Sequence, residues 1–360
     1  MKRAYNFSAG PAVLPESVLL HAQEELLNYE GTGISVLEMS HRSKTFDKII
    51  NDAEILLRRV YQIPENYRVL FLQGGATGMF TALPLNLAQT GTADYVISGI
   101  FAGNAYKEGK KYLKDARIAA TTDDETFSRV PKQDELKLNP KADYVHICDN
   151  NTIFGTRFNY IPDTGNVPLV SDMSSNILSM PIDISKYGVI YAGAQKNIAP
   201  AGLTIVIIRD ELLKDAEDIT PNIWNFKKQA DKNSMLNTPA TFPIYICKLV
   251  LEWIEEIGGL TEIQARNEEK AKILYDYLDA SVFYKATAAK EDRSIMNVCF
   301  RTDSKELDAE FVEEALKYNL IGLKGHRLVG GMRASIYNAM PIEGVKKLVE
   351  FMKEFEKDNR

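Results

Sequence analysis

One stretch of this 360-residue chain decides its fold: Tyr191-Ala192-Gly193-Ala194-Gln195-Lys196-Asn197-Ile198-Ala199-Pro200-Ala201-Gly202. It connects two short apolar runs, residues 187–191 and 203–209, whose β-prone composition predicts a pair of buried strands. Its single lysine, Lys196, stands among alanines and glycines. Because a lysine at the end of an apolar sheet loses solvation, we expect the pKa of Lys196 to be lowered.

The small residues around Lys196 leave room for a bound molecule other than protein. A partly deprotonated amine in a tight pocket can form a Schiff base with an aldehyde cofactor. The alternative is a solvated loop lysine at a strand end, which is the commoner situation for lysines in proteins. The sequence upstream of Lys196 bears on this choice.

An apolar strand within residues 166–176 delivers a carboxylate, Asp172, at its C-terminal end. Ligand sites in open α/β sheets lie just outside the carboxyl ends of the strands. An aspartate there can pair with a pyridinium nitrogen and keep the ring an electron sink, although Asp172 could also cap the turn that follows. A strand with Asp172 followed by a strand with Lys196 favours a pyridoxal phosphate site.

Four widely separated motifs, in the same order, resemble the phosphoserine aminotransferase family. They are Asn6-Phe7-Ser8-Ala9-Gly10-Pro11, Asp172-Met173-Ser174-Ser175, Ala192-Gly193-Ala194-Gln195-Lys196-Asn197 and Gly330-Gly331-Met332-Arg333-Ala334-Ser335-Ile336-Tyr337-Asn338-Ala339. The resemblance spans essentially the whole chain. It implies an α/β fold of the aspartate aminotransferase type. We expect a large domain with a mostly parallel sheet at 16–254 and a smaller α+β domain at 255–360, joined by an N-terminal arm, 1–15.

The same resemblance implies a homodimeric pyridoxal phosphate enzyme whose two subunits share their active sites. The expected reaction moves an amino group from glutamate to 3-phosphohydroxypyruvate, which gives O-phosphoserine and 2-oxoglutarate in serine biosynthesis. The longer phosphorylated analogue that leads to 4-phosphohydroxythreonine in pyridoxine (vitamin B6) synthesis could be a second substrate. We expect ping-pong chemistry in which Lys196 is both cofactor tether and general acid–base catalyst.

The resemblance also implies which residues hold the cofactor. Asp172 supports the ring as an electron sink, and Gln195 helps to position Lys196. Asn237 and Thr238 are expected to reach the cofactor phosphate of the neighbouring subunit. The full expected set is Ala76, Thr77, Phe101, Thr152, Asp172, Gln195, Lys196, Asn237 and Thr238.

A buried strand at 67–72 runs into the glycine-rich turn Gln73-Gly74-Gly75-Ala76-Thr77-Gly78 before a helix. Such a turn presents backbone N–H groups and a helix N-terminus to an anion, here the cofactor phosphate, although a plain tight turn is the commoner case. Thr77 stands where some family members carry an arginine, and Phe101 where most carry a stacking tryptophan. Phe101 can still offer a ring face, or it can simply pack in the core.

Two basic segments are expected to bind the substrate. Arginine suits carboxylate and phosphate groups better than lysine does. By resemblance, Arg333 clamps the substrate α-carboxylate. His326 and Arg327 of one subunit would join His41 and Arg42 of the other around the substrate phosphate. The alternative is a pair of solvated basic loops.

Composition narrows the possible functions. With 43 basic and 49 acidic residues the formal charge is −6, which argues against nucleic acid or an anionic membrane as a partner. No secretory signal pattern opens the chain, and its apolar runs are too short to span a bilayer. Cys148, Cys247 and Cys299 lie in apolar segments without metal-ligand spacing. We therefore expect core thiols, no metal and a cytoplasmic location.

Local patterns yield further expectations. The segment 6–15 is punctuated by glycine and proline, which predicts an extended arm rather than a regular element. Periodicity predicts a helix at 107–113, and the polar stretch 121–139 resembles an insertion. His146, inside an apolar strand, is expected to be a core residue rather than a catalyst.

Two other functions remain open on the sequence alone. A related lyase such as a desulfurase would need a mobile nucleophilic cysteine near the site, and the apolar surroundings of all three cysteines argue against it. A catalytically silent binding protein could use the same fold. The joint presence of Asp172, Lys196 and Arg333 argues against that reading.

Overall fold

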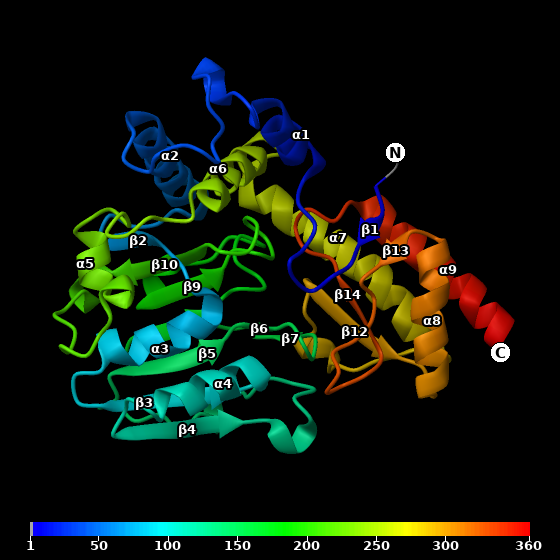
Figure 1. Cartoon of the computed structure of the whole chain (residues 1–360). Helices are drawn as coiled ribbons and strands as arrows, with labels where there is room; N and C mark the ends of the chain where they lie inside the picture. The colour runs from blue at the N-terminus through cyan, green and yellow to red at the C-terminus, as the bar shows by residue number, and fades with distance from the viewer. Residues whose placement is uncertain (1–2) are drawn as a thin grey trace.

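A computed structural model describes residues 3–360 and contains a larger and a smaller lobe (Figure 1). The larger lobe is built on a seven-stranded sheet with the order β2-β10-β9-β8-β5-β3-β4. Its strands are β2 (Tyr67–Leu72), β3 (Thr92–Ile97), β4 (Asp115–Thr121), β5 (Tyr144–Cys148), β8 (Leu169–Asp172), β9 (Val189–Gly193) and β10 (Thr204–Arg209). All run parallel except β10, which is antiparallel to both neighbours. The predicted mostly parallel sheet is confirmed.

Helices bury both faces of this sheet. Apolar residues of α2 and α6 pack on one face, and those of α3 and α4 pack on the other. The helices of the larger lobe are α1 (Glu16–Glu25), α2 (Lys44–Tyr61), α3 (Gly75–Leu87), α4 (Ile100–Gly109), α5 (Phe226–Ala230) and α6 (Thr241–Glu256). Because both faces are covered, the central strands are nearly continuous apolar runs. Within residues 3–360, no helix combines the length and apolar character needed to cross a bilayer.

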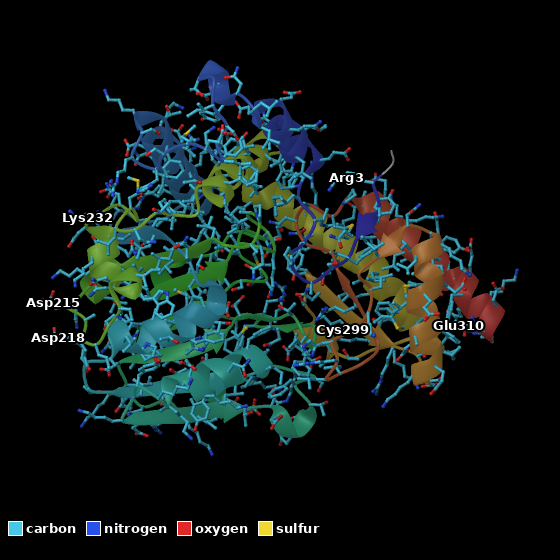
Figure 2. All side chains as sticks on the ribbon, in the orientation of Figure 1. Arg3, Asp215, Asp218, Lys232, Cys299 and Glu310 are labelled. Atoms are coloured by element: carbon cyan, nitrogen blue, oxygen red, sulfur yellow. The ribbon has the colours of Figure 1, made fainter. Side chains whose placement is uncertain are left out.

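The smaller lobe packs helices against a three-stranded antiparallel sheet of order β11-β12-β14. Its elements are α7 (Gly259–Ala280), β11 (Lys285–Ala286), β12 (Asn297–Arg301), α8 (Lys305–Lys317), β13 (Leu320–Ile321), β14 (Met332–Ser335) and α9 (Ile342–Asn359). Cys299 lies on β12 in the interior, whereas Glu310 on α8 and Asp215, Asp218 and Lys232 of the larger lobe lie at the periphery (Figure 2). Short elements complete the chain: β6 (Asn150–Asn151), β7 (Thr156–Arg157) and the 3-10 turns Tyr29–Gly31, Asp123–Glu125, Gln133–Glu135, Ile184–Lys186, Asp210–Leu212, Asn222–Trp224 and Lys290–Asp292.

The N-terminal arm was predicted to contain no regular element, but the structure shows a short strand in it. Its strand β1 (Tyr5–Asn6) pairs in parallel with β13 of the smaller lobe, because β13 offers it unpaired backbone groups. Met1 and Lys2, which belong to the predicted arm, lie outside the described residues. Helix α7 links the two lobes: Leu260 and Ile263 belong to the larger core, and Leu274 to the smaller one.

The helix predicted at 107–113 was misplaced. Helix α4 already ends at Gly109, and the chain then turns so that Leu113 packs into the core and the edge strand β4 begins. The sequence did not predict β4, because this strand is mostly exposed or half-buried and carries no apolar run.

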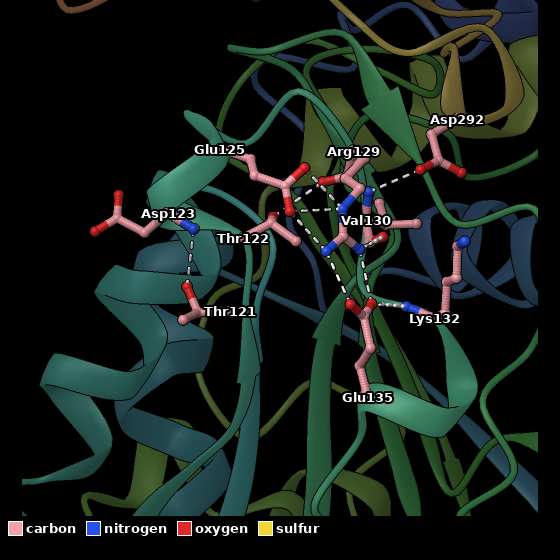
Figure 3. A network of polar contacts seen from close by, with 9 residues as sticks. All are labelled: Thr121, Thr122, Asp123, Glu125, Arg129, Val130, Lys132, Glu135 and Asp292. Atoms are coloured by element: carbon pink, nitrogen blue, oxygen red, sulfur yellow. Dashed lines mark hydrogen bonds and ion pairs between the residues drawn. The ribbon is translucent and has the colours of Figure 1, made fainter.

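The polar stretch 121–139, which resembles an insertion, is anchored by ion pairs within itself and by a hydrogen bond to the smaller lobe (Figure 3). The guanidinium of Arg129 contacts the carboxylates of Glu125 and Glu135, at 2.7 Å in each case. The N–H of Val130 donates to Oδ2 of Asp292, in the smaller lobe, at 2.9 Å. Composition alone marks this stretch as polar; its ion pairs are local, but the hydrogen bond to Asp292 depends on a partner far along the chain.

Candidate active site

A cavity of about 410 Å³ lies beyond the carboxyl ends of β5, β8 and β9. It gathers most of the predicted site residues: Ala76, Thr77, Phe101, Thr152, Asp172, Gln195, Lys196, His326 and Arg333. Asp172 is the last residue of β8, and Lys196 stands three residues after the end of β9. Because the two strands are adjacent and parallel, their carboxyl ends bring both side chains to the same edge of the sheet.

Lys196 is half-buried, and its amine has one close polar partner. Its Nζ donates to Oγ1 of Thr152 at 2.7 Å and lies 5.7 Å from the ring centre of Phe101. Burial lowers the pKa of Lys196 to about 8, even though the negative charge of Asp172 acts in the opposite direction. The predicted lowering of this pKa is confirmed, and the amine is partly neutral near neutral pH.

Asp172 is anchored at the tip of its strand. Its Oδ1 accepts the N–H of Ser174 at 2.9 Å, and Oγ of Ser174 accepts the N–H of Gly193 at 3.0 Å. The aspartate thus caps its own turn and also faces the cavity, so the two roles considered from the sequence are compatible. Burial raises the pKa of Asp172, while the Ser174 hydrogen bonds and Lys196 counteract that rise.

The start of α3 offers backbone donors to the cavity. Gly74 adopts a φ of +104° and turns the chain into the helix. The N–H of Gly75 donates a hydrogen bond to Oγ1 of Thr204 at 2.7 Å. No side chain caps this helix, and the N–H groups of Ala76 and Thr77 have no acceptor among residues 3–360. Free N–H groups and a helix N-terminus at the cavity wall suit a phosphate group, so the residues present fit a phosphorylated cofactor.

Arg333 enters the cavity from β14 of the smaller lobe. Its Nη1 donates to the carbonyl of Thr152 at 3.3 Å, and its buried Nε has no partner in the described part of the chain. A guanidinium with an unused donor can bind a carboxylate. His326 lies nearby, half-buried, and its pKa is lowered by burial and by the positive charges of Arg333 and Arg327.

Five predicted residues lie outside the cavity lining: His41, Arg42, Asn237, Thr238 and Arg327. Asn237 donates from Nδ2 to Oε1 of Gln73 at 3.1 Å, just before the glycine-rich turn. Arg42, Thr238 and Arg327 are exposed. The predicted roles of His41, Arg42, Asn237 and Thr238 depend on a second subunit. Arg327 was expected to act beside His326.

Two residues at the cavity, Cys148 and Gly10, were not predicted as site residues from the sequence. Cys148 was expected to be a core thiol, and it is buried; the sequence did not place it at the site, but it also lines the cavity because it pairs in register with Asp172. Burial raises the pKa of Cys148 well above its usual value, so the group is a protonated thiol. Gly10 of the arm was also missed: a Cβ there would lie 3.4 Å from Cγ of Lys196. Two-residue alternation along β5 and β8 could have identified Cys148.

This fold and this cavity define a class of enzyme. The model of the family described as aminotransferase class-V matches residues 4–348. The chain is therefore a class-V aminotransferase by family.

Relatives narrow the class further. The phosphoserine aminotransferase of Desulfosudis oleivorans is 54% identical over 360 residues, which cover 99% of each chain. A solved structure of the phosphoserine aminotransferase from Bacillus circulans subsp. alkalophilus has a TM-score of 0.98, 44% identity and full coverage of both chains. A pyridoxal phosphate-bound phosphoserine aminotransferase from Trichomonas vaginalis has a TM-score of 0.93 and 40% identity, and covers 98% of this chain and 100% of that one. The chain belongs to the phosphoserine aminotransferase family, as the four motifs indicated.

Proposed function

We propose that the protein is a pyridoxal phosphate-dependent phosphoserine transaminase. It moves the amino group of glutamate to 3-phosphohydroxypyruvate and releases O-phosphoserine and 2-oxoglutarate for serine biosynthesis. The observation that carries this proposal is the placement of Lys196, Asp172 and Arg333 around one cavity in a member of this family. Bound pyridoxal phosphate supplies an aldehyde carbon for the amino group and a ring that accepts electrons from the substrate Cα.

The protein groups have separate tasks in this proposal. Nζ of Lys196 would hold the cofactor and then move a proton between the substrate Cα and the aldehyde carbon of the cofactor, which its lowered pKa permits near neutral pH. Asp172 would pair with the ring nitrogen of the bound cofactor and hold a proton there. The N–H groups of Ala76 and Thr77 bind the cofactor phosphate at the start of α3.

The remaining cavity residues position the cofactor. Phe101 offers a ring face for stacking, Thr152 bonds the hydroxyl side of the ring, and Gln195 orients Lys196. Their presence in the cavity lining supports these roles.

Substrate recognition is assigned to the basic residues. Arg333 binds the α-carboxylate through its forked donors. His326 and Arg327 bind the substrate phosphate together with His41 and Arg42 of a second copy. The 4-phosphorylated analogue of vitamin B6 synthesis is proposed as a secondary substrate, because it shares the carboxylate and phosphate groups.

We propose a homodimer as the working form. Asn237 and Thr238 would complete the phosphate site of the second copy. Leu20, Leu27 and Leu37, in or after α1, are 53%, 84% and 61% exposed. Exposed leucines of this kind suit an apolar face that the second subunit covers.

We further propose the division into a cofactor domain, 16–254, and a smaller domain, 255–360, joined by the arm 1–15. A cytoplasmic location accords with three free, buried cysteines.

A related lyase is a weaker candidate. Cys148 lies in the cavity, but it is part of a strand, and its Sγ donates to the carbonyl of Asn150 at 3.5 Å. A protonated thiol on a rigid strand is a poor mobile nucleophile.

Two measurements test the proposal. Protein mixed with pyridoxal phosphate should turn yellow and lose the colour with borohydride, and the reduced label should be found on Lys196 by peptide mapping. Initial rates of amino transfer from glutamate should be far higher with 3-phosphohydroxypyruvate than with hydroxypyruvate. A colourless protein, or equal rates with both acceptors, would contradict the proposal.

A further inference from the structure

A cluster of buried polar side chains lies next to the active site but outside the cavity lining. It consists of Asn197, Asn267, Lys270 and Asn338, which are 5%, 0%, 2% and 5% exposed. Buried polar groups are costly unless they are hydrogen-bonded. Nearly all polar groups of the cluster are hydrogen-bonded, and these hydrogen bonds join segments that are far apart in the sequence.

Asn338 is the centre of the cluster. Its N–H donates to Oδ1 of Asn197 at 3.1 Å, and its Nδ2 donates to the carbonyl of Leu178 at 2.8 Å. Its Oδ1 accepts from Nδ2 of Asn267, on α7, at 2.9 Å. Three segments are therefore held by one residue.

Two of these segments, and Asn338 itself, are continuous with residues that face the cavity. Asn197 directly follows Lys196, and the loop that contains Leu178 begins at Asp172. Asn338 itself stands five residues after Arg333 in the sequence. The cluster thus links the backbone positions of the amine, the carboxylate and the guanidinium.

Lys270 supports the same turn from α7, which runs from the larger lobe along the smaller one (Figure 1). Its Nζ donates to the carbonyls of Ile336, Tyr337 and Asn338 at 2.9, 2.7 and 3.4 Å. Three carbonyl oxygens match the three donors of an ammonium group. Among the described residues no carboxylate pairs with Lys270, so its hydrogen bonds serve this turn alone.

We propose that Asn338 is a positioning residue that holds the strand of Arg333 in register with Lys196, with Asn267 and Lys270 as its supports. The inference rests on the proposed transaminase function. A substrate carboxylate bound by Arg333 is placed relative to Nζ of Lys196 only through the contacts between the lobes. Productive geometry must be held to within about 0.5 Å, so a loosened link weakens substrate binding in the reactive pose.

The test compares the cofactor-loaded variants Asn197→Ala, Asn338→Ala and Lys270→Met with the wild type. Asn197→Ala removes the acceptor of the Asn338 N–H, whereas Asn338→Ala keeps that N–H and removes the side-chain bonds to Leu178 and Asn267. We expect KM for glutamate and for 3-phosphohydroxypyruvate to rise about tenfold, with a smaller change in kcat. Lys272→Met is the matched control, because Lys272 is an exposed lysine on the same helix and pairs with Asp276. Folded variants with wild-type KM values, or with a loss in kcat alone, would overturn the proposal.

A second measurement needs no catalysis. In the cofactor-free protein, hydrogen exchange of the backbone amides at 174–179 should be faster in Asn338→Ala than in the wild type or in Lys272→Met, because this variant removes the donor to the carbonyl of Leu178. If Asn338→Ala fails to fold, Asn338→Asp keeps the acceptor for Asn267 and replaces only the donor to Leu178. Unchanged hydrogen exchange in a folded variant would contradict the inference. A wild-type protein without amino transfer would instead contradict the proposed function.

Discussion

Nζ of Lys196 donates a hydrogen bond to Oγ1 of Thr152 at 2.7 Å in a cavity where burial lowers the pKa of the lysine to about 8. The hydroxyl acceptor stabilises the ammonium form, and so does the negative charge of Asp172. Burial acts in the opposite direction. The amine is therefore held close to the balance between its charged and neutral forms.

This balance predicts a pH dependence for cofactor capture. Only the neutral amine attacks an aldehyde, so pyridoxal phosphate should react faster as the pH rises through about 8. Asp172→Asn should move the midpoint to lower pH, because the carboxylate favours the ammonium form. Stopped-flow absorbance of the cofactor-free protein measures both midpoints. A capture rate that stays constant from about pH 6 to about pH 10 contradicts the prediction.

Asp172→Ala should reduce amino transfer by roughly a hundredfold or more, because the ring loses its charged support. The thermal unfolding midpoint should change little. Asp183→Ala is the control, since Asp183 is exposed and likewise accepts the N–H two residues on, from Ser185 at 3.0 Å. Normal turnover in Asp172→Ala would refute the role given to this carboxylate.

Arg333→Lys should lower kcat/KM for glutamate by about 10- to 100-fold, because an ammonium cannot replace the forked donors. Arg301→Lys serves as the control, since Arg301 lies on the neighbouring strand β12 and is exposed. Steady-state kinetics would decide. If both variants behave alike, Arg333 does not bind the carboxylate.

The bridge between the lobes should contribute to stability. Asp292→Ala leaves the N–H of Val130 without its acceptor and should lower the free energy of unfolding by ~1–3 kcal/mol. The exposed neighbour Glu291 provides the control variant Glu291→Ala. Denaturant unfolding followed by circular dichroism measures the difference, and equal midpoints for the two variants would show that the bridge contributes nothing.

His146 should make the protein sensitive to acid. It is buried and shares a 2.7 Å hydrogen bond with the hydroxyl of Tyr191, and burial lowers its pKa from 6.5 to about 3. Between these values the unfolded chain binds a proton that the folded state excludes, so stability falls as the pH drops below about 6.5. His146→Phe should therefore lose less unfolding free energy between about pH 7 and about pH 4.5, by up to ~1.4 kcal/mol per pH unit.

The control for this measurement is His21→Gln, because His21 is exposed on α1. It should keep the wild-type slope of stability against pH. The same slope in His146→Phe would exclude His146 as the source of the acid sensitivity.

The buried strands could be predicted because burial on both faces produces apolar runs. β2 was predicted at its observed bounds, and β10 to within one residue. The edge strand β4 and the paired strands β1 and β13 could not be predicted in this way, because each is short or partly exposed. His146 was correctly placed in the core from its apolar neighbours.

By itself, the sequence determined which reactive side chains stand at strand ends. Since parallel strands end at one edge of a sheet, the order of Asp172 and Lys196 along the chain was enough to infer a shared cavity. Only the tertiary structure decided that Cys148 lines this cavity and that Asn338 joins Asn197, 141 positions away. Periodicity reports the face on which a side chain lies, but it contains no information about which distant segment packs against that face.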